Sequence, residues 1–340
     1  MTLGEILDQA IRLYRRNFLA FIGIIAIPYI PLTLIQTGLT YLSTSSLTDY
    51  QPDPSNPFVL PGAYWMGFLG ILAVAIIQGI LVNGVAGAAL TRAVAENYTG
   101  QPVDILGAYR KIGPSLGSLL GAMILFALIM FASGIGATFV PCVGWLVGPG
   151  LFVFLSLVVG PLLAPVVVLE RQSATVSLRR AWDLGRVRFW WLLGFALILS
   201  LFAQLIINGP SYLIQMILQY TLSNQGSLLE QMVWSNVIQV FVQMAGGLLY
   251  LPLQLSAMTV VYFDLRVRAE GLDLALQAAA NSGAETNIVA LTETAPQPTA
   301  SLVTGTEVGQ FILVSLAAVA IYLVLVGIIF TITLAFMSAL

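Results

Sequence analysis

The 340 residues are 59% hydrophobic and only 8% charged, and the mean hydropathy is +0.94. About a quarter of the residues in a soluble domain are charged, so the composition excludes an ordinary soluble protein and a basic nucleic-acid-binding surface. The chain has no histidine and one cysteine, Cys142, which excludes an internal disulfide and a cysteine-based zinc site. We therefore expect an integral membrane protein without a metal ion or another cofactor.

Seven apolar segments are each about as long as the 20 residues that a helix needs to cross a bilayer. In chain order they are 18–42, 66–91, 115–140, 145–169, 189–207, 234–262 and 308–336. A transmembrane β-barrel would need segments of about ten residues with alternating polarity, whereas these segments are longer and continuous. The predicted fold class is an all-α polytopic transmembrane helical bundle.

The 13 lysines and arginines are confined to alternate connections between these segments, and the loops 43–65, 140–144 and 208–233 contain none. Connections rich in lysine and arginine stay on the cytoplasmic side of a membrane. The pattern predicts a multi-pass protein of the prokaryotic cell (inner) membrane with its N-terminus in the cytoplasm.

A short basic segment precedes the first, third and fifth spans. The three segments read ILDQAIRLYRR from residue 6, ILGAYRK from residue 105 and LRRAWDLGR from residue 178. Each has an aliphatic residue, then an alanine followed by a bulky residue, and then basic residues, which indicates an internal repeat. The predicted unit is an interfacial helix followed by two spans, with copies at about 1–98, 99–172 and 173–272.

Three such units form a predicted six-helix membrane domain, residues 1–274. Residues 275–307 are rich in Ala, Thr, Asn, Ser and Pro, a composition typical of a flexible cytoplasmic linker. The linker leads to a C-terminal transmembrane helix in residues 308–340.

The first basic segment has the pattern of an interfacial helix. Thr2 and Glu5 match a capping box, and apolar residues recur at helical spacing. We expect its apolar face to lie in acyl chains and its arginines to meet anionic lipid headgroups, either as plain anchors or as a binding platform. The candidate headgroup contacts are Arg12, Arg15, Arg16, Arg186 and Arg188.

No charged residue is expected at membrane depth, but uncharged polar residues recur along one face of the fifth span and of the sixth. They either line a path for a polar solute or hydrogen-bond between helices at about 0.6 kcal/mol each. The candidate polar path comprises Gln204, Asn208, Asn236, Gln239, Gln243 and Gln254.

The second span of each unit is interrupted at a similar depth, at Asn83–Gly84, Pro161 and Pro252. Such interruptions mark binding sites in some transporters, but they also serve packing alone. A further break, Asn208–Gly209–Pro210, predicts the end of the fifth span and a short surface helix over 211–222.

Glycines recur every four residues in two places, a pattern that lets membrane helices pack closely. They are Gly113, Gly117 and Gly121 before and within the third span, and Gly144 and Gly148 at the start of the fourth. The pattern predicts close packing of the third and fourth spans.

Residues 3–18, 177–191 and above all 262–274 (YFDLRVRAEGLDL) resemble the prokaryotic membrane-domain family named after glycerophosphoryl diester phosphodiesterases. The resemblance covers about residues 2–275 and implies a six-helix membrane domain, sometimes fused to a soluble phosphodiesterase. The seventh span departs from that pattern. Catalysis in the family's soluble domain relies on histidines and metal-binding carboxylates, and this chain has no histidine.

We therefore expect a non-enzymatic membrane protein that organises lipid or partner proteins, with the bilayer and its anionic headgroups as its partners. The alternative is a transporter or channel for a small or amphipathic solute. A lipid enzyme would have to use Asp183, Asp264 or Glu170, and pairing with neighbouring arginines accounts for these carboxylates.

Overall fold

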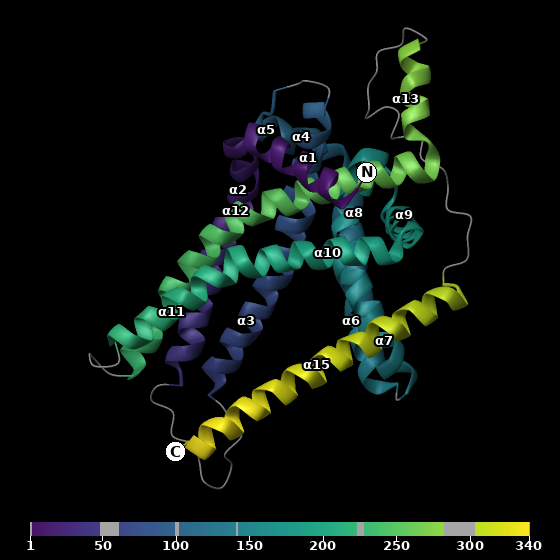
Figure 1. The fold of residues 1–340 in the computed structure, drawn as a ribbon. Helices are drawn as coiled ribbons and strands as arrows, with labels where there is room; N and C mark the ends of the chain where they lie inside the picture. The colour runs from purple at the N-terminus through teal and green to yellow at the C-terminus, as the bar shows by residue number, and fades with distance from the viewer. Residues whose placement is uncertain are drawn as a thin grey trace.

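The computed structural model describes residues 2–47, 61–98, 102–140, 142–222, 228–281 and 303–339, and these residues contain helices and no strand. Seven of the helices are long and apolar enough to cross a membrane. The prediction of an all-α polytopic bundle is confirmed (Figure 1).

Three times along the chain, one short helix (α1, α5 or α9) is followed by two long helices, some of which consist of several consecutive elements. In chain order they are α1 (Leu3–Arg16), α2 (Phe18–Ser45), α3 (Gly62–Gln78), η1 (Gly79–Ala86), α4 (Gly87–Tyr98), α5 (Ile105–Ile112), η2 (Gly113–Ser115), α6 (Leu116–Phe139), α7 (Val143–Phe154), η3 (Leu155–Val159), α8 (Gly160–Glu170), α9 (Ala174–Val187), α10 (Phe189–Ala203), η4 (Gln204–Asn208), α11 (Gly209–Leu222), α12 (Leu228–Glu270), α13 (Leu272–Asn281) and α15 (Gly305–Ala339). The segments η1, η3 and η4 are single π-helical stretches within longer helices, and η2 is a 3₁₀ turn.

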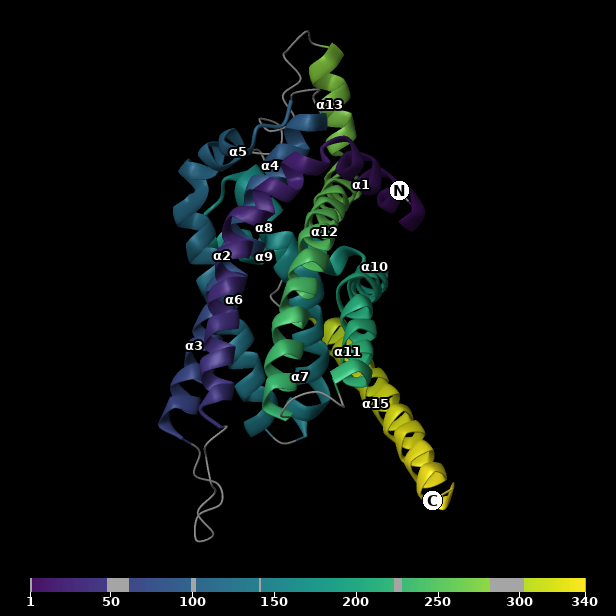
Figure 2. The ribbon, with the colours of Figure 1, turned by 90° about the vertical axis from the view of Figure 1, so that its left-hand side faces the viewer.

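Two of the spans form the centre of the bundle. In the most apolar window of Val143–Glu170 and of Ser235–Glu270, 61% of the residues are buried, against 17–28% in the other spans. The long helix α12 packs against α1, α2, α4, α8, α9 and α11. In Figure 2, α2, α3 and α6 lie on one side of α12, and α10, α11 and α15 lie on the other.

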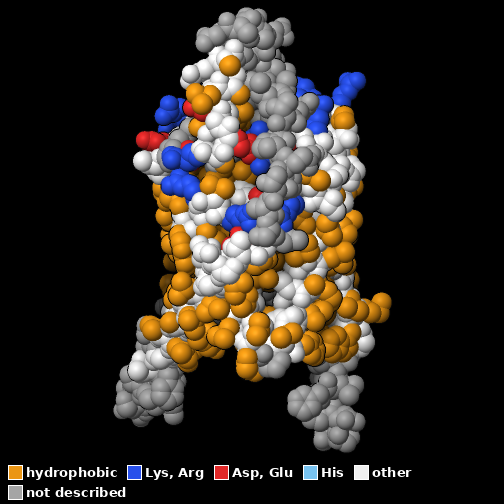
Figure 3. Space-filling view, turned by 90° about the vertical axis from the view of Figure 1, so that its right-hand side faces the viewer, with side chains coloured by type: hydrophobic (Ala, Val, Ile, Leu, Met, Phe, Trp, Pro, Cys, Tyr) orange, Lys and Arg blue, Asp and Glu red, His pale blue; other side chains and the backbone are white. Residues whose placement is uncertain are grey.

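The two ends of the bundle differ in charge. Helices α1, α4, α5 and α9 and the C-terminal end of α12 lie toward one end, and these helices and their flanks contain nearly all lysines and arginines (Figure 1). On the face seen in Figure 3, charged side chains gather above a broad band of hydrophobic ones. We call these two ends the charged end and the uncharged end.

Helix α1 forms as predicted at its start but packs differently. Thr2 and Glu5 make both hydrogen bonds of a capping box. The apolar face lies against α12 rather than in acyl chains, and Ile6 and Ala10 are fully buried there. Burial on the same face raises the pKa of Tyr14 to about 12.

The predicted end of the fifth span at Asn208–Gly209–Pro210 is wrong. Helix α10 continues through η4 into α11, and the π-helical stretch explains how. The Gly209 N–H donates to the Gln204 carbonyl five residues earlier. The extra residue in this turn makes room for Pro210, whose ring would clash with a regular helix, so 211–222 is no separate surface helix.

The glycine pattern predicted only part of the α6–α7 packing. A Cβ added to Gly144 would lie 2.5 Å from the Gly136 carbonyl oxygen, and one added to Gly148 would lie 2.4 Å from the Ala137 Cβ. Helix α7 therefore approaches α6 closely. Gly113 and Gly117 have nothing within 4 Å of an added Cβ, and Gly121 faces α9 instead. For these three residues the prediction is wrong, because the spacing does not indicate which face of α6 meets α7.

The seventh span docks on the bundle with its N-terminal half. The Gly150 N–H of α7 donates to the Ser315 hydroxyl at 2.8 Å, and Phe311 lies among the rings of Phe154, Trp182 and Phe189. The C-terminal end of α15 extends away from the other helices (Figure 2). Most of the predicted linker, 282–302, lies outside the described residues, but its first part is not a flexible coil, because residues to Asn281 belong to α13.

Candidate functional site

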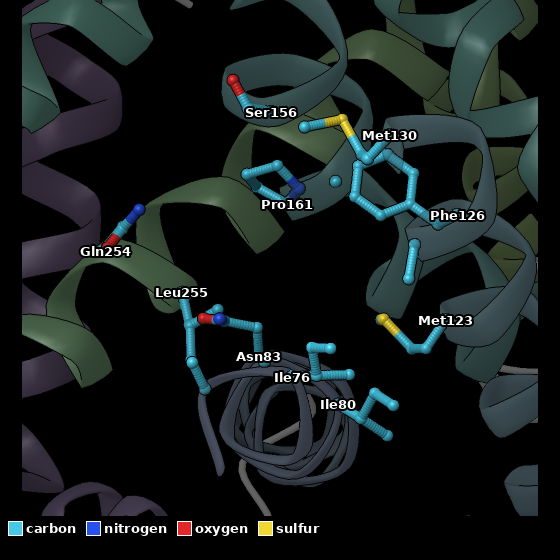
Figure 4. A pocket seen from close by; sticks show the side chains of 14 residues that line it. Ile76, Ile80, Asn83, Met123, Phe126, Met130, Ser156, Pro161, Gln254 and Leu255 are labelled. Atoms are coloured by element: carbon cyan, nitrogen blue, oxygen red, sulfur yellow. The ribbon is translucent and has the colours of Figure 1, made fainter. Parts of the chain in front are cut away.

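A cavity of about 540 Å³ lies in the bundle between α3–η1, α6, η3–α8 and α12 (Figure 4). Two of the four helices that border it contain π-helical stretches, η1 and η3, and such stretches widen a helix locally and often occur at functional sites. Its lining residues are Ala75, Ile76, Gly79, Ile80, Asn83, Met123, Phe126, Ala127, Met130, Ser156, Gly160, Pro161, Gln254 and Leu255. We call it the central cavity.

The central cavity is mostly apolar with a few polar groups. Asn83 and Gln254 approach from one side, and Met123, Phe126 and Met130 face them (Figure 4). Ser156 donates to its own helix at the Val153 carbonyl. Neither amide makes a hydrogen bond to any residue that the structure describes, so both retain their capacity to bind a ligand.

A second cavity of about 290 Å³ lies between α2 and α12, toward the uncharged end, and Gln78 of α3 borders it. We call it the polar cavity. Its side chains are almost all uncharged hydroxyls and amides. They are Tyr29, Thr33, Gln36, Thr37, Thr40, Gln78, Asn236, Gln239 and Gln243, joined by Val240 and Met244.

A third cavity of about 290 Å³, which we call the linking cavity, shares lining residues with both. It shares Tyr29 and Gln78 with the polar cavity, and Ala75, Gly79 and Asn83 with the central cavity. A fourth space of about 130 Å³ continues from Pro161 and Gln254 toward α10. Hydrogen-bonding groups therefore border a series of adjacent spaces from the half of α12 toward the uncharged end to the central cavity.

Toward the charged end the series is closed. Along α12, Gln254 is followed by fully buried residues, and the Thr259 hydroxyl lies 3.2 Å from that of Thr91 on α4. On α8, residues Leu162 to Leu169 are likewise buried. Along the axis of α12 this apolar layer measures about 12 Å, the helical rise from Gln254 to Tyr262.

A buried ion-pair cluster lies behind the apolar layer. Glu170, whose side chain is 0% exposed, accepts from Arg180 Nε at 3.2 Å and from the Tyr262 hydroxyl at 2.9 Å. Arg266 Nη1 lies 3.7 Å from Glu170, and its Nε lies 2.7 Å from Glu270. Arg180 also pairs with Glu270. We call these five residues the charge cluster; it joins α8, α9 and α12.

The candidate polar path splits into two groups. Asn236, Gln239 and Gln243 line the polar cavity, and Gln254 lines the central one. Gln204 and Asn208 instead bond to each other at 2.7 Å on the exposed side of α10–α11, and they line none of these cavities. Of the three predicted interruptions, Asn83 and Pro161 meet at the central cavity, whereas Pro252 is buried beside it.

The candidate headgroup arginines also split. Arg12, Arg15 and Arg16 are exposed and form no ion pair within the described residues. Arg186 is bound to Asp183 at 2.9 Å and to Glu307 at 3.2 Å. Arg188 lies over the Trp191 ring, with Nη1 3.6 Å from Asp264. The last two arginines thus belong to the protein's own packing at the charged end.

The three acids considered for catalysis are paired with arginines, as predicted. Asp183 binds Arg179 and Arg186, Asp264 binds Arg268 and Arg188, and Glu170 lies in the charge cluster. Within the described ranges, no three His, Cys, Asp or Glu residues are grouped so as to hold a metal ion.

Sequence reasoning missed the contribution of α2. Thr33, Gln36, Thr37 and Thr40 all line the polar cavity. Their spacing of three, one and three residues places them on one face of a helix, a signal that was present in the sequence. Gln78 had no such signal, because it is a single polar residue in an apolar span.

No protein-family model, curated protein or solved structure matches this chain.

Proposed function

We propose that the protein is a non-enzymatic membrane carrier that binds an amphipathic solute in the central cavity and moves it through the bundle. One observation carries this proposal: Asn83 and Gln254 lie within two candidate membrane spans and face the central cavity, which is open at α3–η1, without hydrogen bonds from their side chains to the described residues. An unpaired amide in an apolar environment costs several kcal/mol on the scale of transfer to hydrocarbon. A ligand or water in the cavity offsets that cost.

The position of the cavity fits alternating access. Transporters often bind their substrates near the midplane, where helices are interrupted. Here the interruptions η1 and η3 border the cavity, the linked spaces lead toward the uncharged end, and the charge cluster and apolar layer close the other end. We take this arrangement as a state open toward the uncharged end.

We also propose a membrane orientation and a family for this chain. The alternating basic connections support a prokaryotic cell membrane with the charged end in the cytoplasm, so that the cavities open outward. The residue resemblance at 3–18, 177–191 and 262–274 supports membership of the membrane-domain family named after glycerophosphoryl diester phosphodiesterases, and the three short–long–long units support an internal repeat.

A second candidate function rests on α1. Arg12, Arg15 and Arg16 are exposed at the charged end, which fits an electrostatic contact with anionic headgroups of about 1 kcal/mol per arginine. Such a contact supports a role in organising lipid.

Filling the central cavity tests the carrier function. A Cβ on Gly79, which lines the cavity, would meet nothing within 4 Å. Gly79→Leu in reconstituted vesicles is expected to slow translocation of fluorescent lipid analogues by about tenfold, because the added side chain occupies the binding space. Translocation would be measured by quenching of the analogue from one leaflet.

Gly134→Leu is the matched control. It makes the same change at a helical glycine that also has nothing within 4 Å but lines none of the described cavities. Its translocation rate should equal that of the wild type. Equal rates for Gly79→Leu and the wild type would contradict the carrier function.

Cys142 tests the orientation. It is the chain's only cysteine and is exposed at the α6–α7 connection, at the uncharged end. A membrane-impermeant maleimide is expected to label it in intact spheroplasts, and Cys142→Ser should abolish the labelling. Labelling that requires lysis would place the charged end outside.

A further inference from the structure

We infer that the solute has an uncharged headgroup rich in hydroxyl groups, such as a sugar, which binds in the polar cavity while its apolar chain lies in the central cavity. This inference rests on the proposed carrier function and specifies its substrate class. It is drawn from three features of the cavities: the absence of charge in their linings, the chemistry of the polar side chains, and the link between polar and apolar spaces.

None of the four cavities is lined by a Lys, Arg, Asp or Glu residue among those that the structure describes. A phosphate or an ammonium group taken from water into such a space would have no counter-charge, and burial of an unpaired charge is very unfavourable. The lysines and arginines of the described residues lie on the helices and flanks of the charged end, and the charge cluster lies beyond the apolar layer. The linings therefore disfavour phospholipid headgroups and favour neutral ones.

The polar cavity offers the groups that hydroxyls need. Thr33, Thr37 and Thr40 donate their protons to backbone carbonyls in their own helix, at 2.7–2.9 Å, which leaves their oxygens as acceptors. Gln36, Gln78 and the amides of α12 each carry both a donor and an acceptor. A hydroxyl group also donates and accepts hydrogen bonds, so several adjacent hydroxyls can bind both the donors and the acceptors of this lining.

The amides of the polar cavity are free for such a ligand. The side chains of five residues, Gln36, Gln78, Asn236, Gln239 and Gln243, make no hydrogen bond to any residue in the described ranges. The alternative prediction, in which these amides bond between helices, would have required partners across α2 and α12. Five amides that converge on one space without bonding to each other are typical of a site that water or a ligand fills.

The link between the cavities fits an amphipathic shape. Tyr29 and Gln78 border both the polar and the linking cavity, and Gly79 and Asn83 border both the linking and the central cavity. Tyr29 also lies against α12: a Cβ on Gly247 would come 2.2 Å from its hydroxyl oxygen. The headgroup and chain of one molecule can thus occupy adjacent spaces with a single aromatic residue at their junction.

The test compares headgroups on one lipid backbone. Vesicles containing the protein, prepared without alkyl glycoside detergents, would receive fluorescent monoglucosyl-diacylglycerol, phosphatidylglycerol or phosphatidylcholine. We expect the glucolipid to cross at least about tenfold faster than either phospholipid, since each of those would bury a charged phosphate without a partner. Equal rates, or a faster phospholipid, would overturn the inference.

Substitutions connect the preference to the polar cavity. Gln36→Leu and Gln243→Leu are each expected to slow translocation of the glucolipid by about three- to tenfold, because each removes a hydrogen-bonding group. Gln204→Leu makes the same change at an amide outside the cavities and should have no effect. If Gln36→Leu and Gln243→Leu also have none, the headgroup does not bind in the polar cavity.

The outcomes separate the inference from the carrier function. Translocation that depends on Gly79 but not on the headgroup overturns the inference and retains the carrier. A further arm measures entry of free radiolabelled glucose into the vesicles. Entry of glucose without movement of any lipid would show that the apolar chain is not recognised and would overturn the amphipathic assignment, and no movement of either would overturn both proposals.

Discussion

Glu170→Ala is expected to lower the free energy of unfolding by about 3–5 kcal/mol, because it removes one of the two carboxylates that balance the buried Arg180 and Arg266. The Glu170 side chain is 0% exposed and contacts Arg180, Arg266 and Tyr262. After the substitution, Glu270 alone would have to balance two guanidinium groups whose side chains are only 9% and 4% exposed. The measurement is the unfolding free energy from titration with a denaturing detergent.

Lys111→Gln is the control for this effect. Lys111 also forms an ion pair, at 2.7 Å to Glu96, but its side chain is 50% exposed. Exposed pairs contribute about 0–1 kcal/mol, so the variant should unfold close to the wild type. Similar stabilities for Glu170→Ala and Lys111→Gln would show that the charge cluster does not hold α8, α9 and α12 together.

Gly150→Ala is expected to displace the N-terminal half of α15 from the bundle. An added Cβ would lie 2.0 Å from the Phe311 carbonyl oxygen and 2.8 Å from its Cα, which are backbone atoms that cannot move without the helix. The displacement would also break the Gly150–Ser315 hydrogen bond and remove Phe311 from the aromatic rings around it. Loss of the buried ring alone costs about 3–5 kcal/mol.

A double-mutant cycle identifies the cause. If Gly150→Ala acts by displacing α15, then Phe311→Ala should cost much less in its presence than in the wild type, because the ring is no longer packed. Gly134→Ala, with open space around its Cβ, should leave the stability within about 0.5 kcal/mol of the wild type. Additive losses for Gly150→Ala and Phe311→Ala would contradict the docking geometry.

The sequence predicted what depends on composition and periodicity. The seven spans follow from apolar length alone, and the α1 capping box follows from Thr2 and Glu5. The pairing of Asp183 and Asp264 with arginines follows from spacings of three or four residues within a helix. Each of these features depends only on residues that are close together in the chain, so the sequence is enough to predict it.

Features that depend on contacts between distant segments could not be predicted. The sequence does not tell that the apolar face of α1 is covered by α12, that Gln204 points away from the cavities while Gln254 lines one, or that Gly150 receives α15. An apolar helix in a membrane can turn almost any face inward, since lipid tails and leucine side chains are equally apolar. Only packing decides which polar residues meet.

The docking of α15 has a consequence for biosynthesis. Chains are made from the N-terminus, and their parts fold in that order. Gly150 and the rings of Phe154, Trp182 and Phe189 are therefore in the membrane before Phe311 and Ser315 have been synthesised. Until α15 has been synthesised, this groove faces lipid or the insertion machinery, so α15 docks after the six preceding candidate spans have been made.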